Sequence, residues 1–129
     1  MLAKANIHGD NMSYRLLFQK SYDLVKWIYP AVNKFPKSQR LILSQRIENT
    51  SIEILEMVIS LSYKDSKLVR KHILFEIQKL QVLMRLSKDL SFLDFKKYEY
   101  VSGLLKEITD LLDKTWGGSG NADLQKFIQ

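Results

Sequence analysis

Apolar side chains recur every three or four residues along most of the chain, the spacing of a helix that buries one face. This pattern predicts four helices, over residues of about 13–33, 36–63, 66–89 and 94–116. Their short connections favour antiparallel packing of consecutive helices. We therefore predict an all-α fold: an antiparallel up-down four-helix bundle over residues 13–117, between a flexible leader (1–12) and a flexible tail (118–129).

Residue types that favour helix ends support four of these boundaries. Pro36 suits a first helical turn, because the backbone N–H groups of that turn have no partner within the helix. Asp65 and Asp94 each precede a periodic apolar run, so both are candidate N-caps. The sequence GGSG that follows Trp116 ends the last helix.

Pro30 lies inside the first predicted helix. Its ring removes one backbone donor and crowds the carbonyl of Lys26, so we expect this helix to bend there. The bend would direct Lys34, Lys37 and Arg40 out of one end of the bundle, as a basic rim.

The 36–63 helix carries more apolar surface than a single stripe. A helical wheel gives it two apolar sectors with serines between them. A second sector needs a second packing partner: either another copy of the chain, or an unusually central place for this helix in the bundle. We predict a homo-oligomer, in which Glu48 pairs with a group such as an arginine across the interface, because an unpaired buried carboxylate is unfavourable. The predicted interface residues are Leu41, Glu48, Ile52, Leu55, Ile59 and Tyr63.

Candidate polyanion contacts gather on the 66–89 helix. The chain has 20 Lys and Arg against 14 Asp and Glu, a net charge of +6. Rows of exposed cations bind phosphates and gain from counterion release, although such a row can also be a solvated face that only maintains solubility. One face of this helix carries a line without an acidic residue, with Arg70 beside it and Asp89 at its margin: Lys67, Lys71, Leu74, Gln78, Gln81, Arg85 and Lys88.

Little catalytic chemistry is present in the sequence. Cysteine is absent, and the two histidines are His8 and His72. Val69 stands three residues before His72, so the Glu-x-x-His pairs of di-iron bundles are missing. We therefore expect no enzyme, no metal site and no cofactor. No apolar run reaches the length of a membrane span, so we expect a soluble, cytoplasmic protein.

Four short motifs, in this order and spacing, connect the chain to a known family. They are Tyr29-Pro30, the Phe-Pro-Lys of residues 35–37, QRIENT at residues 45–50 and RLSKDL at residues 85–90. The chain resembles the accessory variability determinant proteins of diversity-generating retroelements, over roughly residues 22–116. That family lies within a broader four-helix group that includes proteins encoded in ribosomal RNA intervening sequences.

The resemblance implies a homopentamer with a basic surface that binds a reverse transcriptase and RNA or DNA. Such an assembly supports mutagenic cDNA synthesis from a template RNA and has no catalytic residues of its own. Arg40, Arg46 and Arg85 match basic positions of the family, Lys88 has a similar context, and Gln81 stands where a further cation is expected. Two alternatives remain: a protein of the ribosomal intervening-sequence type, and a scaffold that binds only protein.

Overall fold

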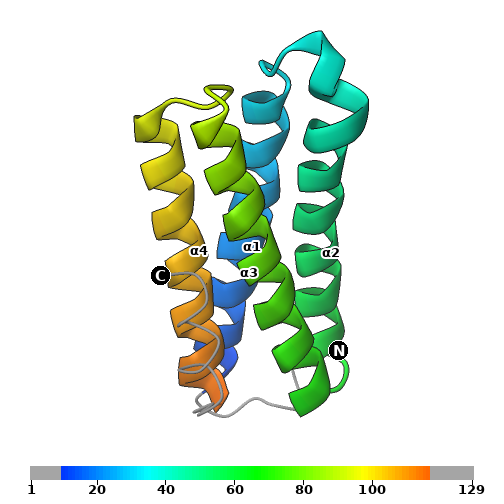
Figure 1. Cartoon of the computed structure of the whole chain (residues 1–129). Helices are drawn as coiled ribbons and strands as arrows, with labels where there is room; N and C mark the ends of the chain where they lie inside the picture. The colour runs from blue at the N-terminus through cyan, green and yellow to red at the C-terminus, as the bar shows by residue number, and fades with distance from the viewer. Residues whose placement is uncertain (1–9, 117–129) are drawn as a thin grey trace.

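The computed structural model describes residues 10–116 of the 129-residue chain. Four α-helices make up most of this range: α1 (Asp10–Val32), α2 (Gln45–Leu61), α3 (Lys67–Asp89) and α4 (Phe95–Trp116). The described residues contain no strand, which confirms the all-α class (Figure 1). The predicted tail lies outside the described residues, as does the predicted leader apart from residues 10–12, which begin α1.

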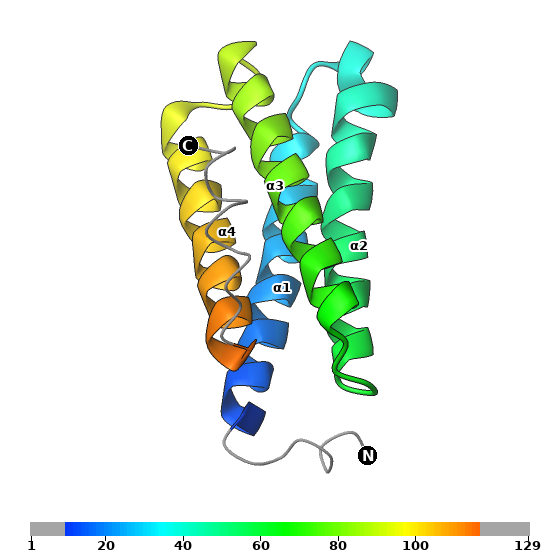
Figure 2. The same ribbon diagram turned by 60° about the horizontal axis from the view of Figure 1, so that its bottom comes forward.

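Each helix packs against two of the others. α1 contacts α2 and α4, and α3 contacts the same two helices. Figures 1 and 2 show the four helices side by side, with consecutive helices antiparallel and with α1 and α3 diagonally opposed. The up-down four-helix bundle is therefore confirmed for the protomer. We call the end that carries residues 33–44 and 90–94 the upper end, as in Figure 1, and the end at residues 62–66 the lower end.

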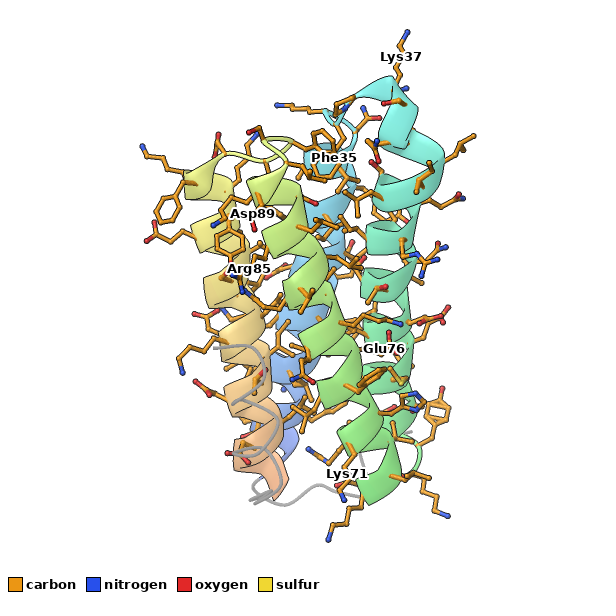
Figure 3. The ribbon with its side chains drawn as sticks, in the orientation of Figure 1. Phe35, Lys37, Lys71, Glu76, Arg85 and Asp89 are labelled. Carbon is orange, nitrogen blue, oxygen red and sulfur yellow. The ribbon has the colours of Figure 1, made fainter. Side chains whose placement is uncertain are left out.

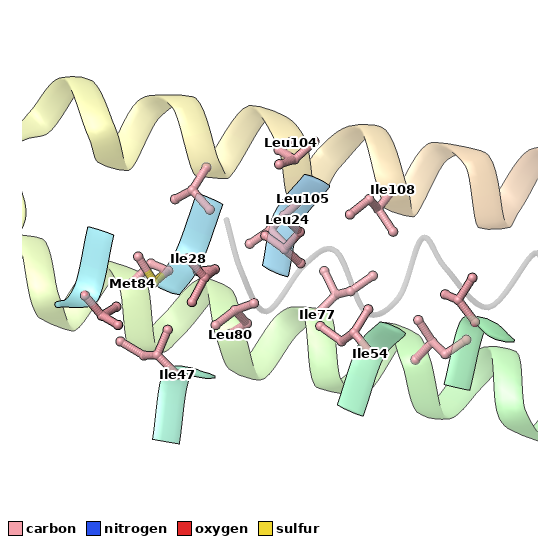
Figure 4. Close-up of a cluster of buried hydrophobic side chains, with 14 of the residues drawn as sticks. Leu24, Ile28, Ile47, Ile54, Ile77, Leu80, Met84, Leu104, Leu105 and Ile108 are labelled. Carbon is pink, nitrogen blue, oxygen red and sulfur yellow. The ribbon is translucent and has the colours of Figure 1, made fainter. Parts of the chain in front are cut away.

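The core lies where the apolar stripes of all four helices meet. Leu24, Ile28, Ile54, Leu80 and Ile108 have no solvent-exposed surface (Figure 4). Burying one such side chain contributes about 1.5–3 kcal/mol, whereas an exposed ion pair contributes about 0–1 kcal/mol. This core, rather than the many surface charges, therefore holds the helices together.

The start of α2 differs from the prediction. Pro36 does precede a helical turn, but that turn is a 3-10 helix (Lys37–Gln39) followed by a π-helix (Arg40–Ser44). The regular α-helix begins only after the π-helix. Turns of the π type are rare and often occur at functional sites. Leu41 and Ile42 both lie in this one, and both are exposed.

Side-chain caps fix the starts of α3 and α4. Ser66, rather than the predicted Asp65, caps α3, because its Oγ accepts a hydrogen bond from the N–H of Val69 at 3.2 Å. Asp94 caps α4 as predicted: its Oδ1 accepts from the N–H of Lys97 at 2.8 Å. Each cap satisfies a backbone donor that the first helical turn leaves without a partner.

α1 begins three residues before the predicted Ser13 and continues through Pro30. Pro30 lies in the last turn, where its missing N–H leaves the carbonyl of Lys26 without the usual helical donor. The bend expected at Pro30 stays a prediction.

Candidate nucleic-acid interface

The upper end of the bundle carries a group of exposed cations. Lys34, Lys37 and Arg40 follow the end of α1, and all three side chains are exposed. Figure 3 shows Lys37 pointing away from the bundle. Arg46, in the first turn of α2, is exposed as well. We call these four residues the upper cations.

The predicted basic line on α3 divides into two parts. Lys67 and Lys71 are exposed in the first turns of the helix, and Arg85 is exposed near its other end. Fourteen residues separate Lys71 from Arg85, which corresponds to about 21 Å at 1.5 Å per residue. Figure 3 shows the two at opposite ends of α3. Arg85 therefore lies on the same half of the molecule as the upper cations, and Lys71 does not.

The middle of the line is half-buried, and Gln81 there contacts α4. The Gln81 amide donates to the Ser102 hydroxyl at 2.9 Å and to the Tyr98 hydroxyl at 3.4 Å. The amide at this position thus takes part in the packing of α3 against α4.

An acidic residue partly neutralises the upper part of the line. Asp89 lies 3.9 Å from Nε of Arg85 and 3.4 Å from Nζ of Lys88. The Lys88 ammonium also lies 4.8 Å from the centre of the Tyr98 ring. Exposed pairs of this kind contribute about 0–1 kcal/mol, so both cations can exchange the carboxylate for a phosphate.

Arg70, predicted beside the basic line, does not lie on this surface. Its side chain turns inward and the residue is only 6 % exposed. The guanidinium donates to both carboxylate oxygens of Asp65, at 2.7 and 3.2 Å, and to the carbonyl of Leu112 at 3.2 Å. Arg70 is therefore a structural residue that ties the α2–α3 connection and α4 to α3. We remove it from the candidate interface.

Comparison with known proteins identifies the family. A family model described as bAvd-like matches residues 15–116, a range that includes most of all four helices. The chain belongs to the bAvd-like family. This result confirms the resemblance to the accessory variability determinant (Avd) proteins, an accessory-protein family associated with the reverse transcriptases of retroelements. No curated protein and no solved structure gave a significant match.

The described part of this bAvd-like chain shows neither a candidate metal site nor a helix that could span a membrane. Within residues 10–116, no three His, Cys, Asp or Glu side chains are grouped so that they could hold a metal ion. In the same range no helix is both long and apolar enough to cross a membrane.

Half of the six residues predicted for the oligomer interface are exposed; we call the six, which lie on α2 and directly before and after it, the α2 surface. Leu41, Ile59 and Tyr63 are exposed, while Ile52, Leu55 and Glu48 are half-buried. Glu48 forms no ion pair with another described residue, so the partner predicted for it would have to come from elsewhere.

This α2 surface borders the seam between α1 and α2. The Tyr14 hydroxyl of α1 donates to the carbonyl of Val58 at 3.4 Å across the seam. Burial raises the pKa of Tyr14, and a neighbouring Ser62 hydroxyl opposes this rise. The phenol therefore remains protonated at neutral pH and can act as a donor.

A second exposed apolar surface, which the sequence analysis missed, lies on α3. Leu68, Phe75 and Val82 follow one another at seven-residue spacing, and Leu86 continues the row. All four are exposed, Leu68 to 75 % and Val82 to 53 %. The seven-residue spacing was a readable signal, but the sequence analysis considered only the basic line on this helix. We call these four residues the α3 row.

Proposed function

We propose that this chain is the accessory protein of a diversity-generating retroelement. In this role it is a non-enzymatic, oligomeric adaptor that binds nucleic acid and the retroelement reverse transcriptase, and so supports mutagenic cDNA synthesis from a template RNA. The observation that carries the proposal is the bAvd-like match over residues 15–116. The exposed cations provide the physical means.

The proposed nucleic-acid surface combines the upper cations with four cations of α3, of which Lys67 and Lys71 lie toward the lower end and Lys88 is half-buried. Lysine and arginine side chains that stay in water until contact lose little solvation and release counterions when they meet phosphates. The members of this surface are Lys34, Lys37, Arg40, Arg46, Lys67, Lys71, Arg85 and Lys88.

Self-association is supported by the two exposed apolar surfaces. The α2 surface borders α1, whereas the α3 row lies on the helix diagonally opposite α1. Two different patches on different sides of a protomer fit head-to-tail contacts, which close into a ring when the rotation allows. Five copies is the number that the family resemblance implies, and we retain it as part of the proposal.

RNA binding at varied salt tests the proposed surface. Each phosphate contact to a single strand contributes about −0.7 to the slope of log affinity against log salt. The triple variant Lys34→Glu, Lys37→Glu, Arg40→Glu should therefore make that slope shallower by about 2 and weaken binding. A matched control changes two lysines and one arginine that are exposed elsewhere: Arg15→Glu, Lys26→Glu and Lys106→Glu.

Equal losses in the two triples would show that only net charge matters, and would contradict an interface at the upper end. Co-purification with the reverse transcriptase encoded beside the gene tests the second partner. A wild-type protein that captures the polymerase but binds no RNA would favour the scaffold that binds only protein.

A further inference from the structure

A depression of about 290 Å³ lies between α2 and α3, beside the upper cations. Its walls are residues from the first turns of α2 and the π-helix before it, together with Lys79 of α3. Figure 3 shows this seam, with Glu76 labelled on the side of α3 that faces α2. Small-ligand sites measure about 300–1,000 Å³, so this one has room for a single small group.

Two exposed amides form one side of the depression. Gln45 and Asn49 are four residues apart on α2, so they share one face of the helix. Each amide offers both donors and an acceptor. That combination matches the edge of a nucleobase, where donors and acceptors alternate, better than it matches a phosphate, which only accepts.

The charged groups of the depression have mixed sign. Arg46 and Lys79 are cationic, and Glu53 is anionic. The Lys79 ammonium lies 3.1 Å from Oε1 of the buried Glu76, an ion pair without a hydrogen bond to that oxygen. The N–H donors of the ammonium are therefore not used by Glu76 Oε1 and can meet a ligand. A simple anion would meet the Glu53 carboxylate, whereas a ligand with one phosphate and a polar ring can use all three groups.

An apolar lip completes the site. Leu41 and Ile42 line the depression and are 83 % and 64 % exposed. Both lie in the π-helix, whose wide turn places two large apolar side chains in succession at the surface. Flipped-out bases are held by hydrogen bonds to their edges and by packing of their faces against aromatic or apolar side chains.

We propose that this depression holds one unpaired nucleotide of a single-stranded nucleic acid. The base lies against Ile42 with its edge on the two amides, and its phosphate contacts Arg46 and Lys79. A paired base cannot enter, because its edge and faces are occupied within the duplex. The inference rests on the proposed nucleic-acid binding. It adds a preference for single strands, which the upper cations alone do not give.

Fluorescence anisotropy with labelled oligonucleotides tests the site. The probes are single-stranded RNA 12-mers of A, C or U, a 12-mer with abasic residues, and a 12-base-pair RNA duplex. The wild-type protein should bind at least one of the three single strands about tenfold more tightly than the abasic strand. The double variant Gln45→Met, Asn49→Leu keeps side-chain size and removes the amides; it should lose this preference and keep its duplex affinity. Gln19→Met, which removes an exposed amide from α1, is the control.

Each contrary outcome is distinct. Equal wild-type affinity for the abasic and normal strands overturns the site while leaving the proposed function intact. An unchanged preference in the double variant overturns the role of the amides. A double variant whose oligomeric mass falls in light scattering shows that a second copy of the chain fills the depression. That result overturns the proposed nucleotide binding at this site. Absence of any binding by the wild-type protein overturns both the site and the proposed function.

Discussion

At the scale of single residues, Arg70 shows that a cation in a basic segment can be structural. Its guanidinium joins Asp65, before α3, to the Leu112 carbonyl in α4. Buried guanidinium groups of this kind stabilise mainly by avoiding unpaired donors and acceptors. Lys71, the next residue along α3, has an exposed side chain. Two adjacent cations therefore have different roles.

Arg70→Met should separate these roles. We expect a loss of about 2–3 kcal/mol in the free energy of unfolding, at or below the low end for breaking a buried pair, because Asp65 stays partly solvated. Lys71→Met should change it by less than about 0.5 kcal/mol, as an exposed substitution does. Urea denaturation measures both. The slope of log affinity for RNA against log salt should show the opposite pattern. It should become shallower in Lys71→Met and stay unaltered in Arg70→Met. A stable Arg70→Met protein would contradict the structural role.

Ser91 offers a second residue-scale test. It follows α3 with a φ of 67°, in the left-handed region. The N–H of Ser91 donates to the carbonyl of Lys88 and the N–H of Phe92 to the carbonyl of Ser87, each at 2.9 Å. This is the Schellman pattern, which favours glycine at the position of Ser91. Ser91→Gly should raise the free energy of unfolding by about 0.5–1 kcal/mol, since glycine adopts this conformation without strain. Ser91→Ala, which keeps the Cβ atom, should show no gain in thermal denaturation.

At the scale of elements, the sequence predicted what depends on local periodicity, and one of the two caps. The four helices were predicted because their apolar stripes are regular, and Asp94 caps α4 as expected. The start of α2 was predicted wrongly, because Pro36 fits the first turn of a 3-10 helix as well as that of an α-helix. The π-helix that follows has no sequence signature that a wheel at 100° per residue would reveal.

For the candidate site, residue type could be read from the sequence but orientation could not. The inward turn of Arg70 and the packing of Gln81 depend on where α4 lies, which a wheel of α3 alone does not contain. Lys79 was missed because it lies off the basic line, toward α2. QRIENT, already singled out as a motif, contains both amides of the proposed nucleotide site, and it was the signal that could have located the depression.

Gly103 tests the packing of α4. It is exposed in the middle of the helix, and a Cβ atom added there would meet no atom within 4 Å. Glycine inside a helix costs about 1 kcal/mol relative to alanine. Gly103→Ala should therefore raise the melting temperature, and circular dichroism measures the change. A fall instead would mean that another molecule approaches the backbone at this position in the assembly.

At the scale of the whole molecule, the arrangement of apolar surface bears on how copies assemble. An isologous dimer uses one self-complementary patch, whereas a ring uses two different patches on each protomer. The α2 surface and the α3 row differ in composition and lie on different helices. This arrangement predicts that a damaging substitution in the α2 surface and one in the α3 row each dissociate the assembly.

Single charges introduced on each surface should test that prediction. Ile59→Glu damages the α2 surface and Val82→Glu the α3 row; both residues are exposed, so the fold should tolerate the change. Each variant should elute as a 15.1 kDa protomer with unchanged helicity, because every contact in a ring would contain one damaged patch. Leu16→Glu, at a similarly exposed leucine on α1, is the control and should keep the wild-type mass in light scattering.

Mixing the two variants then distinguishes a ring from an isologous dimer. In a head-to-tail assembly, the intact α3 row of the Ile59→Glu protein can meet the intact α2 surface of the Val82→Glu protein. One contact between two intact surfaces forms. No further protomer can join, because the two remaining surfaces are both damaged. The mixture should therefore produce one-to-one complexes of about twice the protomer mass, visible in light scattering and in native mass spectrometry. A mixture that stays monomeric, or a wild-type protein that is itself monomeric at micromolar concentration, would contradict contacts between unlike surfaces.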